Sequence, residues 1–221
     1  MKKEKRKLKV KGIILDLDGT IVDSREAYIE AAKAAFAAIG QENVDIKIAK
    51  EIPRRLEQNL SINNMINGID MQKFLDAYLK SYYKVTATKT KPISNVSETL
   101  KKLSQKAKLA LVTMRHVPRE KVIKELEKFG LAKYFQLVVT ALDTSQPKPS
   151  PEALIRCAKQ LGIQISECAV VGDSVADVRA GRNVGAKTVA VLSGIFTREE
   201  LEMEKPYLIL KSVNELPGFL E

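Results

Sequence analysis

The chain of 221 residues has 37 basic and 27 acidic side chains and a formal net charge of +10. Residues 1–11 alone carry a net charge of +6, so we interpret the excess as a solvated basic tail rather than as a nucleic-acid-binding surface. Two cysteines are too few for a disulfide framework, and no apolar run approaches the roughly 18 residues of a membrane span. Composition therefore predicts a globular cytoplasmic protein without a membrane anchor.

Short apolar runs predict a series of buried strands. They lie at residues 13–17, 109–113, 137–140, 168–172 and 188–192, with an edge strand at 207–210. Segments with helical spacing separate them, at residues 96–106, 119–129, 151–161, 174–184 and 197–203. This alternation predicts an α/β fold, a Rossmann-like parallel sheet with helices on both faces.

Residues 24–93 interrupt the alternation. Helical spacing recurs there at residues 26–39, 49–59 and 71–85, and the block carries a net charge of +3. We therefore predict a basic tail at 1–11, an α/β core domain at 12–23 and 94–221, and an inserted helical domain at 24–93. The predicted connections between the domains are residues 22–24 and 90–95.

Acidic residues follow two of the predicted strands. Asp16 and Asp18 follow the first strand, and Asp173 and Asp177 follow the strand at 168–172. In an open α/β sheet, ligands bind at the carboxyl ends of the strands, where four acids would form an oxygen-rich site suited to Mg²⁺. A solvated turn for the first pair, and a helix cap in which Asp177 pairs with Ser174, are the structural alternatives.

Two further residues lie at predicted strand ends or loops and suit phosphate. Lys148 is flanked by prolines in a stiff loop before a helix that we expect to begin with Ser150 as its N-cap and Pro151 as its first residue. A cation beside a helix N-terminus is well placed to meet phosphate. Thr113 ends the strand at 109–113. A solvent-exposed lysine and a plain strand-end threonine are the alternatives.

Taken together, these segments resemble the haloacid dehalogenase superfamily of phosphotransferases. The matching motifs are residues 16–23 (DLDGTIVD), Thr113 after an apolar strand, Lys148 in KPSPE, and residues 172–177 (GDSVAD). They occur in the order that the family has. The helical insertion resembles the small cap domain that closes over the substrate in this family.

The resemblance implies a role for each motif residue. Asp16 would be the nucleophile that forms an aspartyl-phosphate, and Asp18 would be the general acid and then the general base. The acid at position 18 also argues against a true dehalogenase, because a halide leaving group needs no proton. Thr113 would bind phosphoryl oxygens, and Lys148 would neutralise charge on the phosphoryl group and the nucleophile.

The resemblance also implies Mg²⁺ as the cofactor. Its ligands would be Asp16, the backbone carbonyl of Asp18 and Asp173, with Asp177 in or beside the ligand shell. An intact set of these residues argues against a catalytically silent scaffold.

The substrate is less evident in the sequence. Arg54 and Arg55 in the cap suit a carboxylate or a second phosphate, and Arg115 and His116 follow Thr113 closely enough to reach the leaving group. A solvated helix face for the two cap arginines and an exposed loop position for the histidine are equally compatible with the pattern.

The predicted function is a Mg²⁺-dependent phosphatase that hydrolyses a small anionic phosphomonoester, similar to phosphoglycolate. A β-phosphoglucomutase-like phosphosugar mutase and a pyrophosphatase of the same fold are the alternatives. A nucleic-acid-binding protein that uses the basic tail is an alternative of another class. The expected partner is a small phosphorylated metabolite, and the sequence leaves open whether the protein is a monomer or a dimer.

Overall fold

The computed structural model describes residues 7–221 apart from residues 43, 59 and 67–69. The chain forms two compact units: one ends at Val22 and resumes at Pro92, and the other comprises Asp23–Lys91. Both limits fall inside the predicted connections at residues 22–24 and 90–95. None of the described helices combines the length and the apolar character that a membrane span requires.

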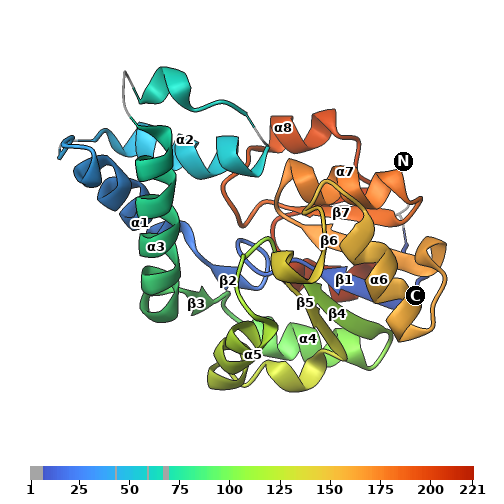
Figure 1. The fold of residues 1–221 in the computed structure, drawn as a ribbon. Coiled ribbons are helices and arrows are strands. Elements are labelled where there is room, and N and C mark those ends of the chain that lie inside the picture. The colour runs from blue at the N-terminus through green and yellow to red at the C-terminus, as the bar shows by residue number, and fades with distance from the viewer. Residues whose placement is uncertain (1–6, 43, 59, 67–69) are drawn as a thin grey trace. The chain divides into compact units, whose positions relative to one another are not determined.

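Six of the described strands form one parallel sheet, in the order β5-β4-β1-β6-β7-β8 (Figure 1). They are β1 (Gly12–Leu15), β4 (Lys108–Val112), β5 (Leu137–Val139), β6 (Cys168–Gly172), β7 (Lys187–Val191) and β8 (Leu208–Leu210). Apolar runs buried on both faces are typical of parallel strands. The predicted parallel sheet is confirmed, and its order places β1 between β4 and β6.

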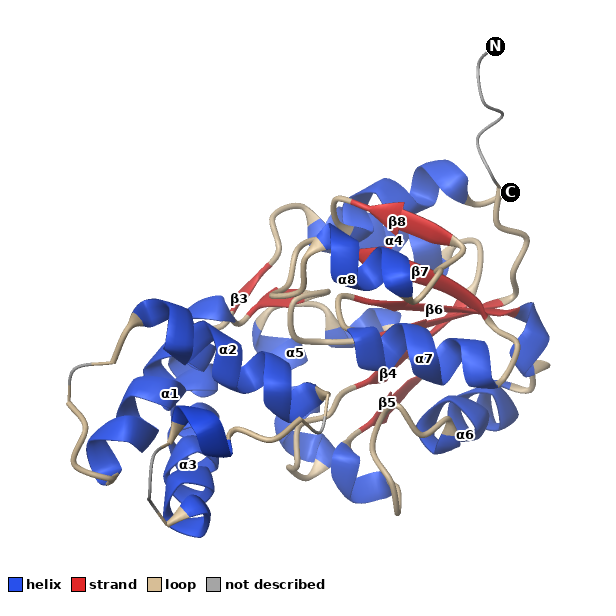
Figure 2. Cartoon of the chain, turned by 90° about the horizontal axis from the view of Figure 1, so that it is seen from above, coloured by secondary structure: helices blue, strands red, loops and turns tan. Residues whose placement is uncertain are grey.

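Helices cover both faces of this sheet (Figure 2). The helices of this unit are α4 (Val96–Ser104), α5 (Arg119–Lys128), α6 (Glu152–Leu161), α7 (Val175–Asn183) and α8 (Arg198–Met203). Alternate strand residues such as Ile14, Ala110 and Val139 pack in one buried cluster with α6. Short 3₁₀ segments lie at Ala132–Tyr134, Ala141–Asp143, Ile165–Glu167 and Val213–Phe219.

Several predicted boundaries are wrong in detail. The first strand ends at Leu15 rather than at residue 17, so Asp16 is the first residue after it. Helix α6 begins at Glu152 with Pro151 in the N-cap position, one residue later than predicted. The tail predicted over residues 1–11 is partly packed: Leu8 is buried, and its N–H donates to the carbonyl of Phe219 at 2.7 Å. The rest of the predicted tail, residues 1–6, lies outside the described residues.

The helical unit contains α1 (Arg25–Ala38), α2 (Ile46–Glu57) and α3 (Met71–Lys89), with a 3₁₀ segment at Asn63–Met65. An alanine stripe on α1 packs against α3, where Phe36 and Phe74 meet edge to face at 5.0 Å. Helix α2 begins three residues before its predicted start, because the Asp45 side chain caps it by accepting a bond from the N–H of Lys47.

Two short strands, β2 (Val22–Asp23) and β3 (Lys91–Pro92), pair with each other at the connections between the units. Each has only two residues, so neither produces the apolar or alternating run on which strand prediction depends. For that reason, sequence patterns predict no strand there.

Candidate active site

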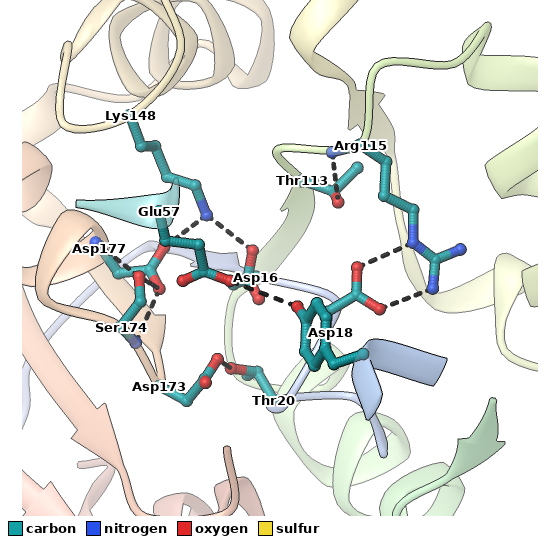
Figure 3. A network of polar contacts seen from close by, with 11 residues as sticks. Asp16, Asp18, Thr20, Glu57, Thr113, Arg115, Lys148, Asp173, Ser174 and Asp177 are labelled. Atoms are coloured by element: carbon teal, nitrogen blue, oxygen red, sulfur yellow. Dashed lines mark hydrogen bonds and ion pairs between the residues drawn. The ribbon is translucent and has the colours of Figure 1, made fainter. Parts of the chain in front are cut away.

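The sheet order brings the chemically reactive side chains of four chain segments to one edge. Asp16 follows β1, Thr113 follows β4 and Asp173 follows β6, while Lys148 lies in the loop before α6. Because the three strands are neighbours and parallel, their carboxyl ends adjoin. Figure 3 shows the resulting network of polar contacts.

Three buried carboxylates form the centre of this network. Asp16, Asp173 and Asp177 each offer an oxygen within 4.8 Å of the others, and all three side chains are buried. Asp177 lies in the first turn of α7, where the Ser174 hydroxyl donates to its Oδ2 at 2.7 Å and accepts from its N–H at 3.2 Å. The predicted capping box and the predicted acidic cluster therefore use the same residue.

Lys148 lies between two of these carboxylates (Figure 3). Its ammonium donates to Asp16 Oδ1 at 2.6 Å and to Asp177 Oδ1 at 2.5 Å, and the residue is only 3% exposed. Charge-assisted bonds of this length in a buried setting are strong and directional. The alternative of a solvent-exposed loop lysine is therefore wrong.

Burial and neighbouring charges both shift the pKa values of Asp16 and Lys148. Burial raises the pKa of Asp16 to about 7, the Asp177 and Asp18 carboxylates add to the rise, and Lys148 opposes it. Burial alone lowers the pKa of Lys148, but the Asp16 and Asp177 carboxylates outweigh it and hold the pKa well above its usual range. We therefore take Lys148 as charged, and burial as the main cause of the raised pKa of Asp16.

The donor set fits a divalent cation. Three buried carboxylates with one ammonium leave net negative charge in a place with little solvent, which is costly without a further cation. Carboxylate oxygens are the ligands that Mg²⁺ prefers, and they are poor ligands for softer metals. The Asp18 carboxylate does not belong to this set, and the metal contact predicted for Asp18 concerns its backbone carbonyl.

Two glycine residues pack directly against the Asp173 side chain. A Cβ added to Gly194, which follows β7, would lie 1.6 Å from Asp173 Oδ2, and one added to Gly19 would lie 2.5 Å from Asp173 Cγ. The Ser193 hydroxyl donates to the Gly19 carbonyl at 2.6 Å, and the Thr20 hydroxyl donates to Asp173 Oδ1 at 3.3 Å. These contacts restrict where the Asp173 carboxylate can lie. Sequence reasoning missed Ser193 and Gly194, for which the only signal was a Ser-Gly pair after a strand.

The Arg115 side chain is paired with an acidic residue of this network. Its Nε and Nη2 donate to the two carboxylate oxygens of Asp18 at 2.8 and 2.7 Å, and its Nη1 bonds Glu125 on α5. The Thr113 hydroxyl accepts the N–H of Arg115 at 3.2 Å, and the N–H of Thr113 itself donates to the Val139 carbonyl. The guanidinium predicted to contact the leaving group thus contacts the predicted acid instead.

The remaining predicted site residues lie elsewhere. His116 is exposed on the loop after β4. Arg54 and Arg55 lie on α2 of the helical unit, where each forms an ion pair with Glu51 and Arg55 also donates to the Ser61 carbonyl at 2.9 Å. Their part in substrate binding remains a prediction.

Comparison with known proteins identifies relatives along nearly the whole chain. The family model described as haloacid dehalogenase-like hydrolase matches residues 13–191. The chain is 28% identical to the phosphoglycolate phosphatase of Escherichia coli strain K12, over 94% of this chain and 91% of that protein. It is 27% identical to pyrophosphatase PpaX of Halalkalibacterium halodurans, over 95% and 96%. The fold matches a haloacid dehalogenase-like family hydrolase from Streptococcus pneumoniae with a TM-score of 0.80 and 17% identity, over 96% and 98%.

Proposed function

Since the chain belongs to the haloacid dehalogenase-like hydrolase family, we propose that it is a Mg²⁺-dependent phosphatase that hydrolyses a small anionic phosphomonoester through an aspartyl-phosphate. The observation that carries the proposal is the buried Lys148 ammonium between Asp16 and Asp177, with Asp173 completing the carboxylate cluster. A cation beside a buried carboxylate can neutralise an incoming phosphoryl group there.

In the first step, an oxygen of Asp16 bonds to phosphorus while the bond from phosphorus to the leaving oxygen breaks. Asp18 gives its proton to that leaving oxygen. In the second step, Asp18 takes a proton from a water whose oxygen bonds to phosphorus, and the bond from phosphorus to Asp16 breaks. The products are the free alcohol and inorganic phosphate, with Asp16 ionised and Asp18 protonated again.

Charge neutralisation allows a carboxylate to approach a phosphate dianion. Lys148 stabilises the negative charge on Asp16 and on the phosphoryl oxygens, and the buried Thr113 would bind those oxygens through its hydroxyl. Asp16, Asp173 and Asp177, with the carbonyl of Asp18, would hold Mg²⁺, which supplies further stabilisation of the charge that builds up on the phosphoryl oxygens.

The substrate class follows from charge and from the named relatives. The positive charge of the helical unit, which carries Arg54 and Arg55, favours an anionic substrate such as phosphoglycolate. The relatives named phosphoglycolate phosphatase and pyrophosphatase support this class. Cys157 and Cys168 are both buried free thiols, which supports a reducing, cytoplasmic location.

A substrate screen with the purified protein tests the proposal. We expect release of inorganic phosphate from phosphoglycolate in the presence of Mg²⁺, and loss of that release in EDTA. Glucose 1-phosphate and pyrophosphate are included, because conversion of a hexose 1-phosphate to its 6-phosphate would identify a mutase and preferred cleavage of pyrophosphate would identify a pyrophosphatase. A protein that releases phosphate from none of these compounds would be incompatible with the proposal.

The variant Gly194→Ala is expected to weaken Mg²⁺ binding about 10- to 100-fold, the usual effect of disturbing the groups that orient a metal ligand. The added methyl group would overlap the Asp173 carboxylate and displace it. The measurement is the rise in thermal midpoint with MgCl₂ concentration, which reports binding to the folded state without turnover.

Gly218→Ala is the matched control, because a Cβ at Gly218 meets nothing within 4 Å. This variant should give the Mg²⁺ titration of the native protein. If Gly194→Ala also retains the native titration, then contact with Gly194 does not orient a metal ligand.

A further inference from the structure

Arg115 is a buried arginine whose guanidinium forms ion pairs with two acidic side chains of the chain. Its side chain is 4% exposed, and the Asp18 and Glu125 side chains that it bonds are 9% and 14% exposed. The contact with Asp18 is a fork, in which Nε and Nη2 each meet one carboxylate oxygen. Such paired, parallel bonds fix the plane of a carboxylate as well as its distance.

The side chain and the backbone of Arg115 are each held by a further bond. Glu125 on α5 bonds Nη1 of the guanidinium, and the Thr113 hydroxyl accepts the backbone N–H of Arg115 at 3.2 Å. The fork on Asp18 is therefore anchored to the end of β4 and to a helix, both of which belong to the same unit as Asp18. Rigid support of this kind is what orients a group that must transfer a proton.

Stability alone is a poor reason for this arrangement. A buried ion pair gains little over apolar residues of similar volume, because desolvation opposes its Coulombic attraction. Building on the function proposed above, we infer that Arg115, braced by Glu125, is a positioning residue that orients the Asp18 carboxyl group for proton transfer to the leaving oxygen. Each Asp18 oxygen uses one lone pair in the fork and keeps a second for the proton that is transferred. Arg115 acts through Asp18 and touches neither phosphorus nor the leaving group.

This role predicts a dependence on the leaving group. A weakly basic leaving oxygen departs without a proton, whereas a strongly basic one needs the acid in place as its bond to phosphorus breaks. Misorienting Asp18 should therefore slow substrates with basic leaving groups much more than substrates with acidic ones. A residue that binds substrate, or one that only supports the fold, would affect both kinds equally.

The test uses a series of aryl phosphates of similar size, from 4-nitrophenyl to 4-methylphenyl phosphate, with kcat and KM measured for each at saturating Mg²⁺. In Arg115→Gln we expect kcat for 4-methylphenyl phosphate to fall about 100-fold, the lower end of what general acid catalysis contributes. The kcat for 4-nitrophenyl phosphate should fall less than about fivefold. Arg115→Lys keeps the charge without the fork, and Glu125→Gln removes the brace. For both variants, kcat for 4-methylphenyl phosphate should lie between the values of the native protein and Arg115→Gln.

Arg179→Gln is the matched control, since Arg179 forms an exposed ion pair with Glu204 at 2.7 Å. It should keep the native dependence on the leaving group. If kcat falls by the same factor for every substrate of the series in all three variants, or if only KM rises, the positioning role is overturned and the proposed phosphatase activity is not. A native protein that is inactive on every aryl phosphate and also on phosphoglycolate, glucose 1-phosphate and pyrophosphate would overturn the proposed function and this inference together.

Discussion

The variant Asp16→Asn is expected to lower kcat for phosphate release by about 10⁴-fold or more, as the loss of a nucleophile does in other enzymes with covalent intermediates. An amide oxygen is a far weaker nucleophile than a carboxylate oxygen. Among the described residues of the acidic cluster, only Asp16 follows β1 directly, so Asp173 and Asp177 are not placed to replace it as the nucleophile. The measurement is inorganic phosphate released with the best substrate of the native protein at saturating Mg²⁺.

The same variant should keep its stability. Burial raises the pKa of Asp16 to about 7, above its ordinary value of 3.8, so the folded state disfavours the ionised form. For an acid shifted in this direction, stability falls as pH rises from about 4 to 7, and the cost is fully present at pH 8. Asparagine removes that cost, so the thermal midpoint at pH 8 in EDTA should equal or exceed the native value.

Asp76→Asn is the control for Asp16→Asn. Asp76 is exposed on α3, where it accepts a bond from the Gln72 side chain that an asparagine oxygen can also accept. This variant should match the native protein in kcat and in thermal midpoint. Retention of more than a few per cent of native kcat in Asp16→Asn, with the protein folded, would contradict a nucleophilic role for Asp16.

The sheet and the position of the acids were predictable because the information is local. Each buried parallel strand is a short apolar run, and its end is marked by polar residues, as at Asp16 and Asp173. Parallel strands share one carboxyl edge, so residues that end different strands are expected to meet. The cluster of Asp16, Asp173 and Asp177 follows from those two rules.

The contacts of the other site residues were not predictable in this way, because they depend on partners far away in the sequence. Arg115 meets Asp18 across 97 positions, and Ser193 meets Gly19 across 174. A single arginine after a strand can serve a substrate or a neighbouring acid equally well, and only the packing of α5 against the sheet decides. The close approach of Gly194 to Asp173 likewise leaves no recognisable pattern in the neighbouring sequence.

Boundaries failed for a related physical reason. The predicted start of α2 followed apolar spacing, but the Asp45 cap extends the helix to Ile46. The basic composition of residues 1–11 suggests a solvated tail, whereas one apolar residue, Leu8, ties the chain to the last residues of the fold. One cap or one buried side chain outweighs the average character of a segment.

Removing the ammonium of Lys148 is expected to lower the free energy of unfolding in EDTA by about 3–5 kcal/mol, the usual result of leaving buried charges without their partner. In Lys148→Met, the carboxylates of Asp16 and Asp177 lose the cation that lies 2.6 and 2.5 Å from them. For a chain of this size the thermal midpoint should fall by on the order of 10 °C. Lys121→Met, at an exposed position on α5, is the control and should leave the midpoint unchanged.

A second substitution shows whether the lost stability comes from unpaired charge or from lost packing. In the Lys148→Met background, Asp177→Asn removes one of the two carboxylates that lost their partner, so it should recover part of the stability. In the native protein, Asp177→Asn alone should not increase stability. Excess Mg²⁺ should also narrow the gap between Lys148→Met and native protein, because a divalent cation in the carboxylate cluster offsets the same negative charge. Equal midpoints for Lys148→Met and native protein in EDTA would contradict this account, since the carboxylates would then need no buried cation to stay folded together.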